Sequence, residues 1–136
     1  MMLCVASGVT VLAALAASGF TLSWTHSVAR TTWWERWQIT GAGLAPVEAR
    51  ITGAGAGMEP PSDATFRDGA WHFVPQIGPQ QQVILAASGA SGSGWRLCAS
   101  GHCRDLPEDG HPLHLWTAPD CAGNPEMAPA VARVSP

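Results

Sequence analysis

The sequence predicts an all-β domain, an antiparallel sandwich or partly open barrel of about eight short strands. Short runs such as Phe20–His26 alternate large apolar and small polar residues, which is the period of a half-buried strand. Glycine and proline number 15 and 11 among 136 residues, and they fall mostly between these runs, where turns are expected. No long segment repeats apolar residues at the helical period.

Composition limits the class of protein. Hydrophobic residues make up 46% of the chain, enough for a core, so global disorder is not expected. The net charge of −3, with arginine as the only basic residue type besides histidine, argues against a surface for nucleic acid or anionic lipid. The length suits one domain. We assign it to residues 1–121 and expect residues 122–136, rich in proline and alanine, to form a loosely ordered tail.

Residues 1–19 have two interpretations. The apolar run that starts at Leu3 is typical of the core of a signal peptide, although the first charged residue is Arg30. The same residues also fit a β-hairpin, with strands at Leu3–Ala6 and Val9–Leu12 and a turn at Ser7-Gly8. Polar residues and glycines interrupt the run, so no transmembrane span is expected.

Turn signals separate the elements that follow. Gly53–Gly57 with Pro60-Pro61 predicts an irregular loop, Arg67–Ala70 a turn, and Ser88–Gly94 a glycine-serine turn or loop. Between them we expect strands at Phe20–His26, Trp34–Ile39, Leu44–Thr52, Trp71–Val74, Val83–Ala87, Trp95–Cys98 and Leu113–Trp116, with His102–Arg104 following the turn at Ala99–Gly101.

Four cysteines allow three disulfide pairings. Cys98 and Cys103 can be bridged within a hairpin across Ser100-Gly101, which leaves Cys4 and Cys121 to pair or to stay free. The alternative is a zinc site built from Cys98, Cys103 and Cys121 with His111 or His114, but tight Cys-x2-Cys spacing is absent, so no metal is expected. Disulfides form in oxidising compartments. They therefore predict the periplasm or cell envelope, and reduced thiols would instead fit the cytoplasm.

Several polar residues interrupt apolar strands and are ligand or partner candidates: His26, Ser27, Glu35, Glu48 and Arg50. If their strands are neighbours, these side chains can converge on one face. A histidine beside a carboxylate can act as an acid-base pair, and a serine can act as a nucleophile. However, no Gly-x-Ser-x-Gly motif surrounds Ser27. We assign no catalytic residue, and a polar network that sets strand register is the simpler interpretation.

Seven tryptophans are many for this length. Those within strand patterns are expected in the core, namely Trp24, Trp37, Trp71 and Trp95. Trp33 and Trp34 follow a turn, so they are candidates to line a cleft or a partner surface. The glycine-rich loop Gly53–Gly57 lacks a following helix, and the chain has no lysine for a phosphate loop. No cofactor is expected.

Several short motifs between His26 and Trp71 follow one another in a distinctive order. His26-Ser27-Val28 ends a strand and is followed by Arg30, an aromatic pair and Glu35; next come Val47–Arg50, the loop Gly53–Met58 and Asp68-Gly69-x-Trp71. This order resembles the bacterial domain of unknown function 1850, a small domain often encoded beside TRAP transporters of the TAXI type. The resemblance runs roughly from Leu3 to Cys121, although Ala29 stands where members often carry an acidic residue.

The resemblance implies a strand and turn before the Phe20 strand, which favours the hairpin at Leu3–Leu12. The family has no established enzymatic activity. The resemblance therefore implies a non-catalytic accessory or binding module of the cell envelope, linked to a TRAP-type solute transporter, with transporter subunits or a solute receptor as partners. The alternatives are a small hydrolase or metal-dependent enzyme that uses His26 and Ser27 or the Cys/His cluster, and a structural domain without a ligand.

Overall fold

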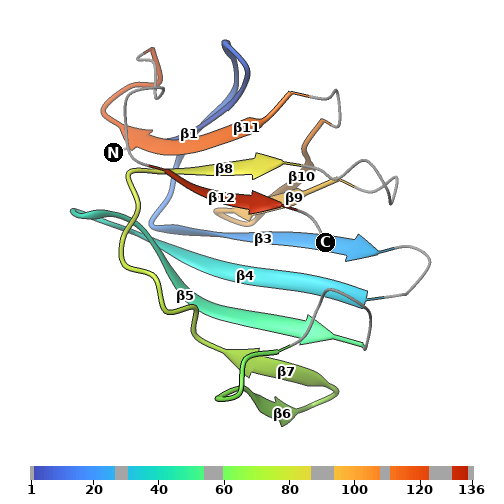
Figure 1. Cartoon of the computed structure of the whole chain (residues 1–136). Helices are drawn as coiled ribbons and strands as arrows, with labels where there is room; N and C mark the ends of the chain where they lie inside the picture. The colour runs from blue at the N-terminus through green and yellow to red at the C-terminus, as the bar shows by residue number, and fades with distance from the viewer. Residues whose placement is uncertain are drawn as a thin grey trace.

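The computed structural model describes residues 2–26, 31–53, 60–86, 94–107, 111–122 and 130–134, with only the backbone given for residues 26, 86 and 130–134. These residues form an all-β fold of two sheets, without a helix (Figure 1). The strands are β1 (Met2–Ser7), β2 (Thr10–Ala16), β3 (Gly19–His26), β4 (Thr31–Thr40), β5 (Gly43–Thr52), β6 (Thr65–Arg67), β7 (Ala70–Phe73), β8 (Gln82–Ala86), β9 (Arg96–Ala99), β10 (His102–Asp105), β11 (Leu113–Ala118) and β12 (Ala130–Val134).

The larger sheet has seven antiparallel strands in the order β10-β9-β3-β4-β5-β7-β6. Strands β3, β4 and β5 form its centre, and β7 and β6 continue it downwards in Figure 1. The register of β4 and β5 shifts between Arg36 and Trp37, next to Pro46, which has no N–H to donate to a neighbour. This bulge keeps Leu44 and Ile51, on its two sides, both fully buried.

The smaller sheet has five strands in the order β12-β8-β11-β1-β2. Its described pairs are antiparallel except for β12, which runs parallel to β8. The N-terminal residues form the hairpin β1–β2, with Gly8 at a φ of 57° in the turn. Strand β1 lies between β11 and β2, and its Leu3, Cys4 and Val5 are fully buried. The N-terminal segment is therefore part of the sandwich core.

The inward-facing side chains of both sheets meet in one hydrophobic core. It combines residues of β1, β8 and β11 with residues of β3, β4, β5 and β9. Trp24, Trp37 and Trp95 are buried there as expected, and Trp37 stacks on Phe20 with ring centres 6.0 Å apart. Trp71 packs against the same core while partly buried. Burying each such side chain contributes about 1.5–3 kcal/mol, so the tryptophans are a large part of what holds the sheets together.

Two hairpins use the same turn chemistry. Asp68-Gly69 joins β6 to β7, and Ser100-Gly101 joins β9 to β10. In each pair both residues have positive φ values, 52° and 79° in the first and 52° and 80° in the second. Two-residue hairpin turns require this backbone, and glycine adopts it without steric cost. The sequence predicted a turn at both places.

Two disulfides close the fold. Cys4 of β1 is bonded to Cys121, across a sequence separation of 117 residues, and Cys98 is bonded to Cys103 at directly paired positions of β9 and β10. Both pairs are among those that the sequence allowed. Two disulfides are consistent with an oxidising location outside the cytoplasm. Over the described residues, no helix is long and apolar enough to cross a membrane.

The described residues form more strands than the sequence indicated, twelve rather than about eight. The additional ones are short: β6 has three residues, and all side chains of β6 and β10 are exposed, so neither strand shows an apolar face in the sequence. Strand β4 begins at Thr31 rather than at Trp34. Residues 130–134, expected within a loose tail, form β12 at the edge of the smaller sheet.

Candidate functional site

A cluster of charged side chains lies on the outer face of the larger sheet. Its members are Arg36 of β4, Glu48 and Arg50 of β5, and His72 of β7, with Trp34 of β4 beside them; we call it the Glu48 cluster. The strand register sets their positions. Arg36 lies opposite Glu48, and Arg50 lies opposite Trp34 on one side and His72 on the other. Successive side chains of a strand alternate between faces, so five polar or aromatic residues from three strands meet outside the core.

Glu48 is the centre of the cluster. Arg50 Nε donates a hydrogen bond of 2.8 Å to Glu48 Oε2, and Arg36 Nη2 lies 3.5 Å from Glu48 Oε1. His72 Nδ1 lies 3.5 Å from Glu48 Oε2, and its Nε2 lies 3.2 Å from the backbone oxygen of Arg67. The Glu48 side chain is only 19% exposed. One mostly shielded carboxylate therefore lies within 3.5 Å of two guanidinium groups and an imidazole, and its closest contact is with Arg50.

The electrostatic environment lowers the pKa of Glu48 below the usual value of a glutamate side chain. The hydrogen bond from Arg50 is the largest cause, and the positive charges of Arg50 and Arg36 and the contact with His72 act in the same direction. Desolvation by burial opposes them, since it disfavours the charged form. Glu48 is accordingly a carboxylate over the physiological range and not a proton donor.

Trp34 fixes the guanidinium of Arg50 from the other side. The Arg50 guanidinium carbon lies 4.3 Å from the centre of the Trp34 ring. This is a cation–π contact, in which the electron-rich face of the ring attracts the cation. Arg50 is therefore held between an aromatic face and a carboxylate, with its side chain still 44% exposed.

Two cavities adjoin the Glu48 cluster. One of about 380 Å³ is lined by Glu48 and His72 together with Thr65, Arg67 and the apolar Val47, Phe73 and Val74. The other, of about 390 Å³, lies on the side of Arg36 and reaches Thr21, Gln38, Cys98 and Ser100. The outer face is thus hollowed on both sides of the Glu48 cluster.

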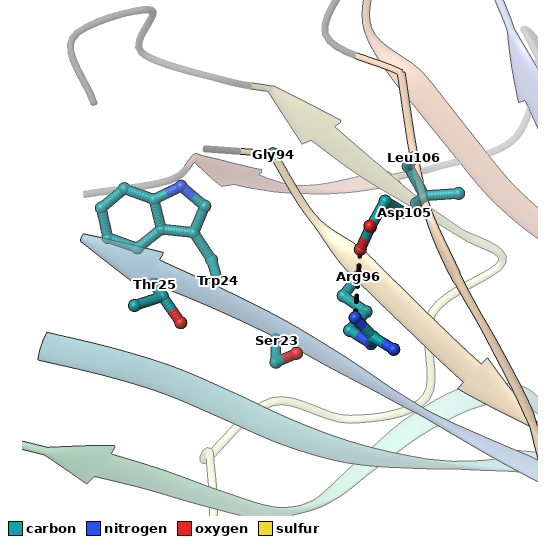
Figure 2. A pocket seen from close by; sticks show the side chains of 7 residues that line it. All are labelled: Ser23, Trp24, Thr25, Gly94, Arg96, Asp105 and Leu106. Carbon is teal, nitrogen blue, oxygen red and sulfur yellow. Dashed lines mark hydrogen bonds and ion pairs between the residues drawn. The ribbon is translucent and has the colours of Figure 1, made fainter. Parts of the chain in front are cut away.

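A further cavity of about 410 Å³ lies where β3 passes the β9–β10 hairpin (Figure 2). Ser23, Thr25 and the Arg96–Asp105 ion pair line it, together with Trp24, Gly94 and Leu106. Figure 2 shows the Trp24 ring on the opposite side of β3 from the Ser23 and Thr25 side chains. Arg96 Nη1 lies 3.5 Å from Asp105 Oδ1, so the positive charge of this arginine is matched locally.

The predicted ligand residues do not all share one face. Strands β3, β4 and β5 are neighbours, as the hypothesis required, and Glu48 and Arg50 lie together. Glu35 is fully buried and belongs to the opposite, inward face of β4. The alternation of a strand explains the difference, because Glu35 and Arg36 are adjacent and must point to opposite sides. The expected convergence of Glu35 with Glu48 is therefore not observed.

The aromatic pair divides in the same way. Trp33 points inwards and packs edge-on against Phe73, with ring centres 6.2 Å apart, whereas Trp34 faces outwards under Arg50. The backbone of His26 pairs with Thr31. The His26 side chain, all of Ser27 and residues 54–59 of the glycine loop lie outside what the structure describes.

Arg36 and His72 belong to the Glu48 cluster but were not among the residues predicted for the site. Both occupy outward positions in strands that were expected, but their importance depends on which residues lie opposite them. Counting back from the turn at Gly41-Ala42 would have aligned Arg36 near Glu48. The bulge between Arg36 and Trp37 shifts that count by one residue, and Pro46, which lies opposite Trp37, is the sequence feature that could have indicated it.

The zinc alternative is wrong for the cysteines. All four are in disulfides, so their thiolates cannot bind a metal ion. His114, one of the proposed ligands, has its Nδ1 3.0 Å from Gln82 Oε1. Across the described part of the chain, no group of three or more His, Cys, Asp or Glu side chains lies close enough to hold a metal.

Comparison with known proteins identifies the family. The family model described as a domain of unknown function (DUF1850) matches residues 20–106, which contain β3 apart from Gly19, strands β4 to β10 and the whole Glu48 cluster. No curated protein and no solved structure matches the chain. Because the match covers more than half of the sequence, the chain belongs to the DUF1850 family.

Proposed function

We propose that this protein is a non-catalytic binding module of the bacterial cell envelope, and that it recognises a partner through the outer face of its larger sheet. The observation that supports this proposal is the Glu48 cluster, in which one carboxylate orders Arg36 and Arg50 while both side chains remain about half exposed, 53% and 44%. Arginine and tryptophan are enriched among the residues that dominate binding at protein interfaces.

Stability alone is a weak reason for such a cluster. Ion pairs exposed to solvent contribute about 0–1 kcal/mol each. A network of two arginines and a carboxylate therefore adds little to folding. Its physical effect is to hold the guanidinium groups in a defined geometry before a partner arrives, which lowers the entropy cost of binding.

The compartment and the partner that we propose are supported by different observations. The two disulfides, Cys4–Cys121 and Cys98–Cys103, support the periplasm as the compartment. The resemblance of the motif order around His26 and Glu35 to a domain often encoded beside TAXI-type TRAP transporters supports a transporter subunit or its solute receptor as the partner.

Co-purification tests the proposal. The tagged chain, expressed with the TRAP membrane subunits and the solute receptor, is expected to retain one of them. The double variant Arg36→Glu/Arg50→Glu is expected to lose that partner, while Arg96→Glu, a charge reversal on the same sheet, is expected to keep it. Circular dichroism of each variant verifies folding. Consistent absence of all these proteins from the purified wild-type complex would overturn the transporter link.

A second measurement addresses catalysis. A fluorophosphonate probe labels activated serine nucleophiles covalently. We expect no labelling of Ser27 in the folded protein. Labelling that depends on Ser27 and is lost in Ser27→Ala would contradict a non-catalytic role.

A further inference from the structure

We infer that the partner surface is acidic, and that Arg36 and Arg50 receive carboxylate groups of a protein. This inference deepens the proposed function and rests on it, because it names the chemistry that the outer face recognises. It follows from the unbalanced charge of the Glu48 cluster, from its unused hydrogen-bond donors, and from its open position on the sheet.

The Glu48 cluster carries excess positive charge. Two guanidinium groups, which stay protonated in proteins, face the single carboxylate of Glu48. The chain as a whole has a net charge of −3, so this local excess runs against the overall charge. Arg67 lines the adjoining cavity and adds a further cation to the same side of the sheet. The field of such a patch attracts anionic surfaces and repels cationic ones.

Arg36 and Arg50 also have N–H groups that Glu48 does not accept hydrogen bonds from. Arg50 uses Nε for Glu48, and within the described residues no protein atom accepts a hydrogen bond from its Nη1 or Nη2. Arg36 contacts Glu48 through Nη2 alone. The planar guanidinium fork matches a carboxylate through two parallel N–H···O bonds. The contacts with Glu48 and Trp34 orient Arg50 through its Nε and the face of its guanidinium, so its two terminal nitrogens remain available to a carboxylate.

The open position favours a protein over a small solute. Arg36 and Arg50 lie on the exposed face of a sheet, where a single ion pair with a free anion is weak because water screens it. Several carboxylates on one rigid surface bind together and share a single entropic cost of association. A small carboxylate would lack that advantage. The face therefore fits an acidic protein surface.

Arg96 is an arginine of the same sheet that lies outside the Glu48 cluster. It lies on β9 of the same sheet and its side chain is 54% exposed, close to the 53% of Arg36. Its charge, however, is matched by Asp105 at 3.5 Å. Arg96 therefore has the same chemistry and exposure as Arg36 without the excess charge, which makes it a matched control.

A nuclear magnetic resonance titration of the full chain with an oligo-aspartate peptide tests the inference. We expect the peptide to shift the signals of Arg36, Arg50 and the Trp34 indole, and the shifts to vanish in molar salt. In Arg36→Gln/Arg50→Gln the affinity for the peptide is expected to fall about fivefold or more, the combined size of two exposed ion pairs. Arg96→Gln is expected to bind as the wild type does.

Three results would overturn the inference: peptide shifts that avoid the Glu48 cluster, an equal loss of affinity in Arg96→Gln, or equally strong binding of acetate, which would indicate a small-anion site. The inference and the proposed function can fail separately. If a transporter subunit or receptor co-purifies equally with wild type and with Arg36→Gln/Arg50→Gln, the protein binds a transporter partner, but recognition of an acidic surface by these two arginines is excluded. If the peptide binds as expected and no transporter protein co-purifies, the recognised chemistry stands and the transporter link does not.

Discussion

Arg50 and Trp34 occupy directly opposite positions on β5 and β4, and the guanidinium carbon of Arg50 lies 4.3 Å from the centre of the Trp34 ring. The pair links two neighbouring strands across the exposed face of the larger sheet. Because Glu48 holds Arg50 from the other side, the guanidinium is fixed by two contacts of different physical origin, one with a charge and one with an aromatic face.

A double-mutant cycle of Trp34→Leu and Arg50→Gln is expected to give a coupling energy of about 0.5–1 kcal/mol, the size of a partly exposed cation–π contact. The measurement is urea unfolding of the four proteins, followed by circular dichroism. The control cycle pairs Trp33→Leu with Arg50→Gln. Trp33 packs on Phe73 on the opposite face, so its effect is expected to add to that of Arg50. Additivity in both cycles would contradict the contact.

Glu48→Gln is expected to reduce stability at neutral pH by about 0.5–1 kcal/mol, the value of a partly shielded ion pair. The lowered pKa of Glu48 means that its contribution is fully present above the unfolded-state pKa, near 4.5, and is lost as pH falls through the lower folded-state pKa. The difference between variant and wild type should therefore shrink as the pH falls below about that value.

Urea unfolding across this acidic range measures the difference, with Asp105→Asn as the control. The Asp105 side chain is 80% exposed and pairs with Arg96 at 3.5 Å, so its loss is expected to change stability by less than about 0.5 kcal/mol. A difference for Glu48→Gln that stays constant below pH 4.5 would show that its carboxylate is not stabilised in the folded state.

The fold class could be predicted because alternation is a local property of sequence. In β3 the large residues Phe20, Leu22 and Trp24 all point into the core. Their alternation with small polar residues can therefore be recognised from the sequence of this strand alone, whichever strands lie beside it. Short edge strands such as β6 lack this pattern, since all three of its residues are exposed. Their pairing depends on turn geometry and on the strand beside them.

The candidate site could be predicted only in part, because it depends on register. Glu48 and Arg50 lie two residues apart on one strand, so their shared face follows from the period of a strand. Arg36 and His72 join them from other strands, and the bulge beside Trp37 shifts the alignment by one residue. Glu35 illustrates the same limit, because its burial depends on which face of β4 meets the other sheet.

The two disulfides are expected to differ in their effect on stability. Cys4–Cys121 spans 117 residues, whereas Cys98–Cys103 spans five. In the chain-entropy model a longer loop restricts the unfolded chain more, which gives about 4–5 kcal/mol for the first bond and about 2 kcal/mol for the second. We therefore expect Cys4→Ala/Cys121→Ala to unfold at a much lower urea concentration than Cys98→Ala/Cys103→Ala. Equal midpoints for the two double variants would contradict this account.

Gly43 is expected to be the least replaceable glycine of the β4–β5 hairpin. Its φ is 123°, a backbone conformation that residues with a Cβ rarely adopt, and an added Cβ would collide with the backbone oxygen of Gln80. The same segment is held by two hydrogen bonds of 2.8 Å between the backbones of Leu44 and Gln80, which tie β5 to the chain before β8. Gly43→Ala must therefore disturb either the turn or this connection.

We expect Gly43→Ala to lower the free energy of unfolding by at least about 1–3 kcal/mol, the range for forcing a non-glycine residue into a sparsely populated backbone region. Gly41→Ala is the matched control, two residues away in the same turn, because nothing lies within 4 Å of its added Cβ. Thermal unfolding of both variants measures the effect. Since the contact with Gln80 lies at the turn end of β4 and β5, the affinity for an oligo-aspartate peptide should persist in folded Gly43→Ala. Equal melting temperatures for the two alanine variants would mean that the turn has another conformation.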